Sequence, residues 1–163
     1  MIFIIIVAVI ILLIFFRYYL SQPIVHKVTQ NQLGKYFKIL LYRGYDGGYT
    51  IIEGSLKKTF LQYKKYITEN EVYLEMSFPK AKWSQEYYDR LKEYLEKREI
   101  KYRINNSSES PIEFIDINCS NDIDFCTALT RDIFVNIFDY TDDDLNYKIK
   151  FYDVSPKDEK IGF

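Results

Sequence analysis

The pattern of hydrophobic and polar positions divides the chain into an apolar beginning and a longer part in which the two kinds of residue alternate. Residues 1–16 contain no polar side chain, and the stretch to Leu20 reaches roughly 30 Å as a helix, about one hydrocarbon core of a bilayer. No basic segment precedes it and no small-residue cleavage site follows it, which disfavours a secretory signal. We therefore expect a transmembrane helix over 1–20 and a polar juxtamembrane connector over 21–36.

Two short apolar runs and an amphipathic segment come next. The runs at 37–42 and 50–53 flank a turn rich in Gly, and this arrangement predicts a β-hairpin. The segment 56–68 shows helical spacing, so we expect a helix there with lysines on an adjoining face. Its apolar positions recur at intervals of four, three and four residues: Leu56, Phe60, Tyr63 and Ile67.

From residue 72 onward the periodicity switches regularly between that of strands and that of helices. Alternation predicts strands at 72–78, 100–104, 112–117 and 147–153, and helical spacing predicts helices at 85–98 and 122–138. The order strand, helix, strand, strand, helix, strand is that of a ferredoxin-like βαββαβ sandwich, an antiparallel sheet with both helices on one face. With the preceding hairpin and helix, we expect a single α+β domain over 37–155, followed by a tail over 156–163.

Charge is distributed unevenly although the net charge is only −1. Residues 17–103 carry 17 Lys/Arg and 10 Asp/Glu, whereas residues 104–163 carry 5 and 13. Basic residues after the apolar segment place the C-terminal domain in the cytoplasm by the positive-inside rule, at the inner face of the cell membrane. A basic half beside the bilayer would be attracted to anionic lipids. The alternative is that the fold mixes the two halves in space and leaves only faces of different sign.

Residues suited to catalysis are few. A single histidine, His26, excludes mechanisms that need two imidazoles, and two cysteines cannot form a disulfide framework or a four-thiolate zinc site. Cys119 precedes a predicted helix N-terminus but has no base nearby in the sequence, and Cys126 falls on an inward helical stripe. The acidic run 142–144 lacks the alternating ligands of a calcium loop. We expect no catalytic residue, cofactor or metal site.

Tyrosine is abundant, with 16 residues, more than one small core can hide. Tyrosine suits interfaces because one end is apolar and the other hydrogen-bonds. The expected interaction surface combines the turn around Gly47, the lysines of the predicted helix and the acidic loop: Tyr45, Asp46, Tyr49, Lys57, Lys58, Lys64, Lys65, Tyr140, Asp142, Asp143 and Asp144. An isoelectric point of 5.9 and the acidic second half oppose nucleic-acid binding.

One segment carries a resemblance. Residues 112–138, IEFIDINCSNDIDFCTALTRDIFVNIF, comprise an apolar strand, a turn with a cysteine and a helix opened by Asp122. This arrangement resembles the strand and helix of small bacterial proteins of the toxin–immunity type. The resemblance implies protection of a cell through binding of a toxin, without chemistry of its own.

These observations favour a membrane-anchored protein-binding module without catalytic activity, of which an immunity or inhibitor protein is one form. Its partners would be the bilayer, through residues 1–20, and another protein; the oligomeric state is left open. Two alternatives remain. One is a module that binds anionic lipid through the basic helix 56–68, and the other is an enzyme with an unfamiliar carboxylate or thiol site.

Overall fold

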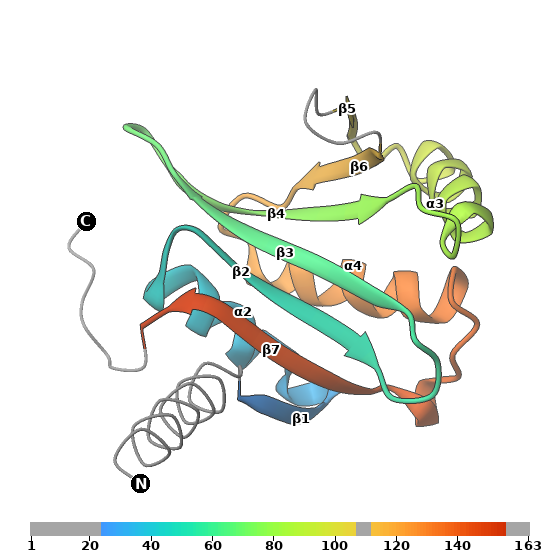
Figure 1. Cartoon of the computed structure of the whole chain (residues 1–163), viewed down its shortest axis with the longest axis horizontal. Helices are drawn as coiled ribbons and strands as arrows, with labels where there is room; N and C mark the ends of the chain where they lie inside the picture. The colour runs from blue at the N-terminus through green and yellow to red at the C-terminus, as the bar shows by residue number, and fades with distance from the viewer. Residues whose placement is uncertain (1–23, 107–111, 156–163) are drawn as a thin grey trace, which may run out of the picture.

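The computed structural model describes residues 24–106 and 112–155, which form one antiparallel sheet with helices packed on it (Figure 1). The strands are β1 (Val25–Thr29), β2 (Gly44–Gly54), β3 (Phe60–Ile67), β4 (Val72–Pro79), β5 (Arg103–Asn106), β6 (Glu113–Asn118) and β7 (Asn146–Val154). The helices are α2 (Leu33–Arg43), α3 (Gln85–Lys97) and α4 (Ile123–Asn136), with short 3₁₀ turns at Gln30–Gln32 and Asp142–Asp144.

The seven strands lie in the order β1-β7-β2-β3-β4-β6-β5, and every neighbouring pair is antiparallel. All three helices lie on the same side of this sheet, behind the strands in the view of Figure 1. Alternate residues of each strand therefore meet the helices, and the residues between them point to the other side. In β3, for example, Leu61, Tyr63 and Lys65 are buried while their neighbours are half-buried.

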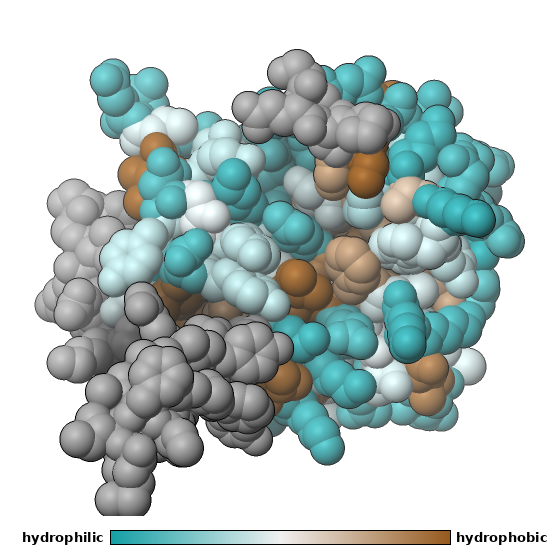
Figure 2. Space-filling model, viewed as in Figure 1, coloured by the Kyte–Doolittle hydropathy of each residue, from teal (hydrophilic) through white to brown (hydrophobic). Residues whose placement is uncertain are grey.

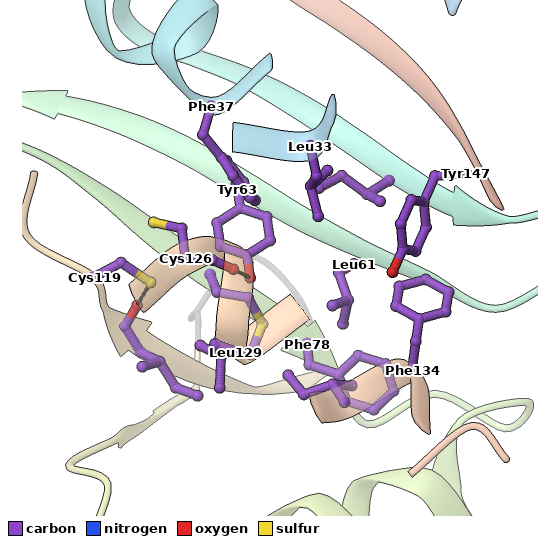
Figure 3. Close-up of a cluster of buried hydrophobic side chains, with 14 of the residues drawn as sticks. Leu33, Phe37, Leu61, Tyr63, Phe78, Cys119, Cys126, Leu129, Phe134 and Tyr147 are labelled. Carbon is purple, nitrogen blue, oxygen red and sulfur yellow. Dashed lines mark hydrogen bonds between the residues drawn. The ribbon is translucent and has the colours of Figure 1, made fainter. Parts of the chain in front are cut away.

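The core lies between the sheet and the helices (Figure 3). Phe37 of α2 packs edge-on against Tyr63 of β3, with ring centroids 4.6 Å apart. The buried Tyr63 hydroxyl lies 2.7 Å from Thr130 Oγ1 of α4, so this polar group is satisfied inside the core. Phe134 of α4 meets Tyr147 of β7 edge-on at 5.0 Å. Burial of each such side chain contributes about 1.5–3 kcal/mol, which fixes the helices against the sheet.

The elements expected from residue 72 onward are present with small shifts of their ends. α3 and α4 form where the helical spacing predicted them, and β4, β6 and β7 form where alternation did. Asp122 caps α4 by accepting a hydrogen bond from the Phe125 backbone N–H at 2.8 Å. The strand expected at 100–104 is displaced to Arg103–Asn106.

The ferredoxin-like arrangement, however, is wrong. β4, α3 and β5 do form one split βαβ unit, since β6 lies between the two strands. A ferredoxin-like sheet would then place β7 directly beside β4. Instead the β2–β3 hairpin is inserted between them, because β2 pairs with β7 and β3 pairs with β4. The fold is α+β with a wider sheet and a third helix.

Near the beginning of the domain, one segment expected as a strand is a helix, and one expected as a helix contains a strand. Residues 37–42, expected as a strand, belong to α2, where Leu33, Phe37, Leu40 and Leu41 form a buried helical stripe. The basic helix expected over 56–68 does not exist. Its first residues form a bend and the rest are β3, in which Lys64 and Lys65 point to opposite sides of the sheet. Leu56, expected in the apolar stripe, is 62 % exposed.

The membrane assignment is also corrected. Within residues 24–106 and 112–155, no helix is long and apolar enough to cross a bilayer. The longest helix of these ranges, α4, has 14 residues and therefore spans about 21 Å, against about 30 Å of hydrocarbon. This finding contradicts the expected single-pass protein at the inner membrane. The segments expected as anchor (1–20) and tail (156–163) lie outside the described residues, whereas β1 and the start of α2 occupy most of the expected connector.

Candidate functional site

The side of the sheet that faces away from the helices is the candidate site, and we call it the open face. Figure 2 shows this side, a mixture of hydrophilic and intermediate residues with a few hydrophobic ones between them. Its residues come from alternate positions of β2 to β7: Tyr49, Ile51, Glu53, Phe60, Gln62, Lys64, Tyr66, Tyr73, Glu75, Ser77, Arg103, Asn105, Asp116, Lys148, Lys150 and Tyr152.

Two pairs of stacked tyrosines stand on the open face. Tyr49 and Tyr152 lie opposite each other in β2 and β7, with parallel rings 4.6 Å apart. Tyr66 and Tyr73 form the second pair across β3 and β4, at 5.2 Å. The ammonium of Lys64 lies 4.9 Å from the ring centre of Tyr66 and forms a cation–π contact. One face of each of these four rings is therefore already in contact with another side chain of the protein.

Beside the second pair lies a carboxylate cluster, formed by Glu75, Ser77, Arg103, Asn105 and Asp116. The Ser77 hydroxyl donates to Asp116 Oδ1 at 2.6 Å, and the Asn105 amide donates to Oδ2 at 3.2 Å. Arg103 Nη2 donates to Glu75 Oε2 at 2.6 Å, while its Nε lies 3.9 Å from Asp116 Oδ2. The cluster thus ties the edge strand β5 to β4 and β6.

Both carboxylates of the cluster are buried although they lie on the open face. Glu75 is 3 % exposed and Asp116 is 4 % exposed, whereas the Arg103 side chain above them is 63 % exposed. Burial and the neighbouring Asp116 charge raise the pKa of Glu75, and Arg103 opposes this rise. Burial, together with the charges of Glu75 and Asp116, raises the pKa of the Tyr66 phenol to about 12. Two buried acids share one exposed guanidinium.

A hollow of about 180 Å³ opens over this cluster. Tyr73, Tyr102 and Lys101 form part of its wall, and Glu75, Arg103 and Asp116 are also in contact with it. The hollow is smaller than the 300–1,000 Å³ that is usual for small-molecule pockets. Its size fits a single side chain of a binding partner better than a whole ligand.

The structure separates the residues that the sequence analysis grouped as an interaction surface. Tyr49 and Lys64 lie on the open face, but Lys65 is buried on the helix side, where its ammonium donates to the Gly44 carbonyl at 2.8 Å. Tyr45 is exposed in β2, and Asp46 accepts a hydrogen bond from the Ile67 backbone N–H. These five residues therefore do not share one face.

The remaining members of that group lie at the other end of the sheet. Tyr140 is buried, and its hydroxyl accepts a hydrogen bond from the Lys57 backbone N–H at 2.8 Å. The Lys57 ammonium donates to the Phe138 carbonyl, and Lys58 is exposed in the same bend. In the acidic loop Asp142 pairs with Arg131 at 2.6 Å, Asp144 accepts from the Thr141 hydroxyl, and Asp143 is exposed.

The two cysteines belong to the core. Cys119 and Cys126 are both buried free thiols near Tyr63 (Figure 3), and a hydrogen bond with Cys119, together with burial, raises the pKa of Cys126. A buried thiol with a raised pKa is a poor nucleophile. No group of three or more potential metal ligands occurs in the part of the chain that the structure describes.

Sequence reasoning missed Glu75, Arg103 and Asp116. Their strands alternate, so the polar positions of β4 could have been assigned to the outer side of the sheet. The sequence does not reveal the strand order β4-β6-β5, which brings Arg103 beside both acids.

Comparison with protein-family models, curated proteins and solved structures finds no match to this chain. The resemblance to toxin–immunity proteins therefore stays a prediction.

Proposed function

We propose that this protein is a protein-binding module that binds its partner through the open face. The observation that carries the proposal is the pair of buried carboxylates, Glu75 and Asp116, held beneath Arg103 on the side of the sheet opposite the three described helices. Buried charges are costly unless they are paired, and on a surface they mark a place where water is already excluded. Water exclusion of this kind is a property of the centre of an interface.

The residue types of the open face support a protein partner. Tyr and Arg are enriched among the residues that dominate binding energy in protein interfaces. Arg103 is held from below by Glu75, so its remaining donors are oriented toward solvent with little further loss of entropy. We expect Arg103, Tyr73 and Tyr152 to provide most of the affinity.

The same residues argue against a nucleic-acid platform. Proteins that bind single strands on a sheet stack bases against free aromatic faces. Here Tyr49 and Tyr152 cover each other, while Tyr66 is covered by Tyr73 on one side and contacted by Lys64. Each pair therefore leaves less free ring face for the stacking of bases, whereas tyrosine hydroxyl groups suit hydrogen bonds to a protein surface.

The experiment is site-specific photocrosslinking in cells of the source organism. A benzophenone amino acid replaces Lys148 on the open face or, as the control, Ala128, which is exposed on α4. We expect one discrete adduct from position 148 and none from position 128. The adduct should be lost when Tyr49→Ser and Tyr73→Ser are added, with the far-UV circular dichroism unchanged. Equal labelling from both positions, or none from either, would refute the proposal.

A further inference from the structure

A groove lies on the helix side of the sheet, at the end where the β3–β4 hairpin projects beyond the other strands (Figure 1). Its volume is about 590 Å³, within the range of binding pockets. Leu41 and Tyr42 at the end of α2 form one wall, and Ile67 and Val72 at the two arms of the hairpin form the other. We call this the hairpin groove; it is separate from the open face.

The hairpin groove is lined by exposed apolar surface. Tyr42 is 51 % exposed and Ile67 is 39 % exposed, and both side chains border the same hollow with the buried Leu41 behind them. Large hydrophobic side chains gathered around a concavity are typical of a binding surface, whereas single ones scattered over a protein are common. The groove therefore offers apolar contact to a ligand.

The accessible charge of the hairpin groove is negative. Glu69 and Glu71 are exposed at its rim, and among the residues that the structure describes neither lies within ion-pair distance of a basic side chain. Lys65 also lines the groove, but it is 1 % exposed and its ammonium is directed to the Gly44 carbonyl. The lysine thus caps the C-terminal end of α2 instead of neutralising the glutamates.

The tip of the hairpin is held in one shape. Thr68 N–H and Oγ1 both donate to the Glu71 carbonyl, at 2.9 and 3.0 Å, and the Glu71 N–H donates back to the Thr68 hydroxyl at 3.1 Å. The Ile67 N–H donates to Asp46 at 2.9 Å, which fastens the hairpin to β2. Because the turn uses backbone groups and the Thr68 hydroxyl, the two glutamate side chains remain available, and the backbone from which they extend is fixed.

We propose that the hairpin groove binds a short segment of a partner protein in which apolar side chains alternate with lysine or arginine. The apolar side chains would fill the space between Tyr42 and Ile67, and the basic groups would pair with Glu69 and Glu71. Charge complementarity selects this occupant, because unpaired carboxylates repel both nucleic-acid phosphates and anionic lipid. The inference does not depend on the open face.

The test uses the full chain and three blocked synthetic peptides, measured by isothermal titration and by NMR shift changes. The first is Leu-Lys-Phe-Lys-Leu, the second Leu-Glu-Phe-Glu-Leu, and the third Ser-Lys-Ser-Lys-Ser. We expect only the first to bind, with shift changes at Tyr42 and Ile67. The double variant Glu69→Gln, Glu71→Gln should weaken binding by about 3- to 30-fold, as two exposed ion pairs allow.

Charge reversal provides the sharper comparison. With Glu69→Lys and Glu71→Lys the groove should prefer the acidic peptide, while the matched reversal of Glu86 and Glu93 on α3 leaves the preference unchanged. Equal binding of the basic and acidic peptides, an equal effect of the α3 control, or no binding of any peptide at millimolar concentration would overturn the proposal. A concentration-dependent dimer that the groove variants abolish would make a second copy of this chain the occupant, and would also overturn it.

Discussion

Replacement of Arg103 by glutamine tests the energetics of the carboxylate cluster. The substitution removes the hydrogen bond of 2.6 Å from Nη2 to Glu75 Oε2 and the longer contact of 3.9 Å to Asp116. It leaves two carboxylates, 3 % and 4 % exposed, without a cation between them. Since the side chain of Arg103 is largely exposed, the loss should come mainly from electrostatics rather than from packing.

The expected loss of unfolding free energy depends on how far each partner of the ion pair is buried. Breaking a fully buried pair costs about 3–5 kcal/mol, and a single charge-assisted hydrogen bond contributes about 1.5–3 kcal/mol. The Arg103 side chain is 63 % exposed, so water replaces part of what it supplies. We therefore expect the free energy of unfolding to fall by about 1.5–3 kcal/mol at pH 7.

The loss of unfolding free energy caused by Arg103→Gln should be larger at pH 7 than at pH 4. The pKa of Glu75 in the folded protein lies above its ordinary value of 4.5, and removal of Arg103 takes away a contribution that lowers it. A carboxyl whose folded pKa is raised holds its proton more firmly in the folded state, so stability falls as pH rises from 4.5 through the folded pKa. At pH 4 the Glu75 carboxyl is largely protonated, so Arg103→Gln should lower the free energy of unfolding less than it does at pH 7.

The assay is urea unfolding at pH 4 and pH 7, followed by circular dichroism. Glu75→Gln provides the background in which Arg103→Gln should cost less than half as much, because the buried charge is gone. Arg98→Gln, which removes an exposed arginine 5.3 Å from the Tyr94 ring, should cost under about 0.5 kcal/mol. An Arg103→Gln cost that is the same at both pH values and in both backgrounds would refute the electrostatic account.

Three further predictions concern the framework. Gly54→Ala should destabilise by about 1–3 kcal/mol or more in urea unfolding, because a Cβ would overlap the Tyr140 hydroxyl, whereas Gly34→Ala has room and should be neutral or stabilising. Burial lowers the pKa of Lys65, so the folded ammonium loses its proton first and wild-type stability should rise as pH rises from the folded pKa toward the ordinary value of 10.5; this rise, measured by thermal melts, should be absent in Lys65→Met. Asp122→Ala should cost about 1 kcal/mol in urea unfolding, and Asp122→Asn, which still caps, should cost less.

The sequence predicted the elements where its periodicity was long and unambiguous. α3 and α4 each extend over more than three turns, so the helical stripe is repeated often enough to be recognised. The short apolar run at 37–42 predicts a strand, because the full helical stripe of α2 begins at Leu33, ahead of the run. The segment 56–68 predicts a helix in place of β3, because Lys65 occupies a buried position of the strand and interrupts its alternation of apolar and polar residues.

The candidate site could be predicted only in part. Alternation in β4 assigns Tyr73, Glu75 and Ser77 to one side of the sheet, and this much follows from the sequence. The proximity of Arg103 depends on β6 lying between β4 and β5, a long-range pairing that no local pattern specifies. The hairpin groove is still harder to foresee, because it needs the end of α2 beside a hairpin whose first arm, β3, falls in the segment predicted as a helix.

The inserted hairpin explains why one side of this sheet is available at all. β2 and β3 widen the sheet between β7 and β4, and the helices all pack on one side of it. An open side alone does not indicate a partner, since antiparallel sheets commonly face water. A face adapted only to water would leave its charges hydrated, however, whereas Glu75 and Asp116 are both buried and Arg103 only partly offsets the cost that burial imposes on Glu75. Binding through the open face therefore depends on these two carboxylates, and replacement of both by their amides without loss of the crosslinked partner would contradict it.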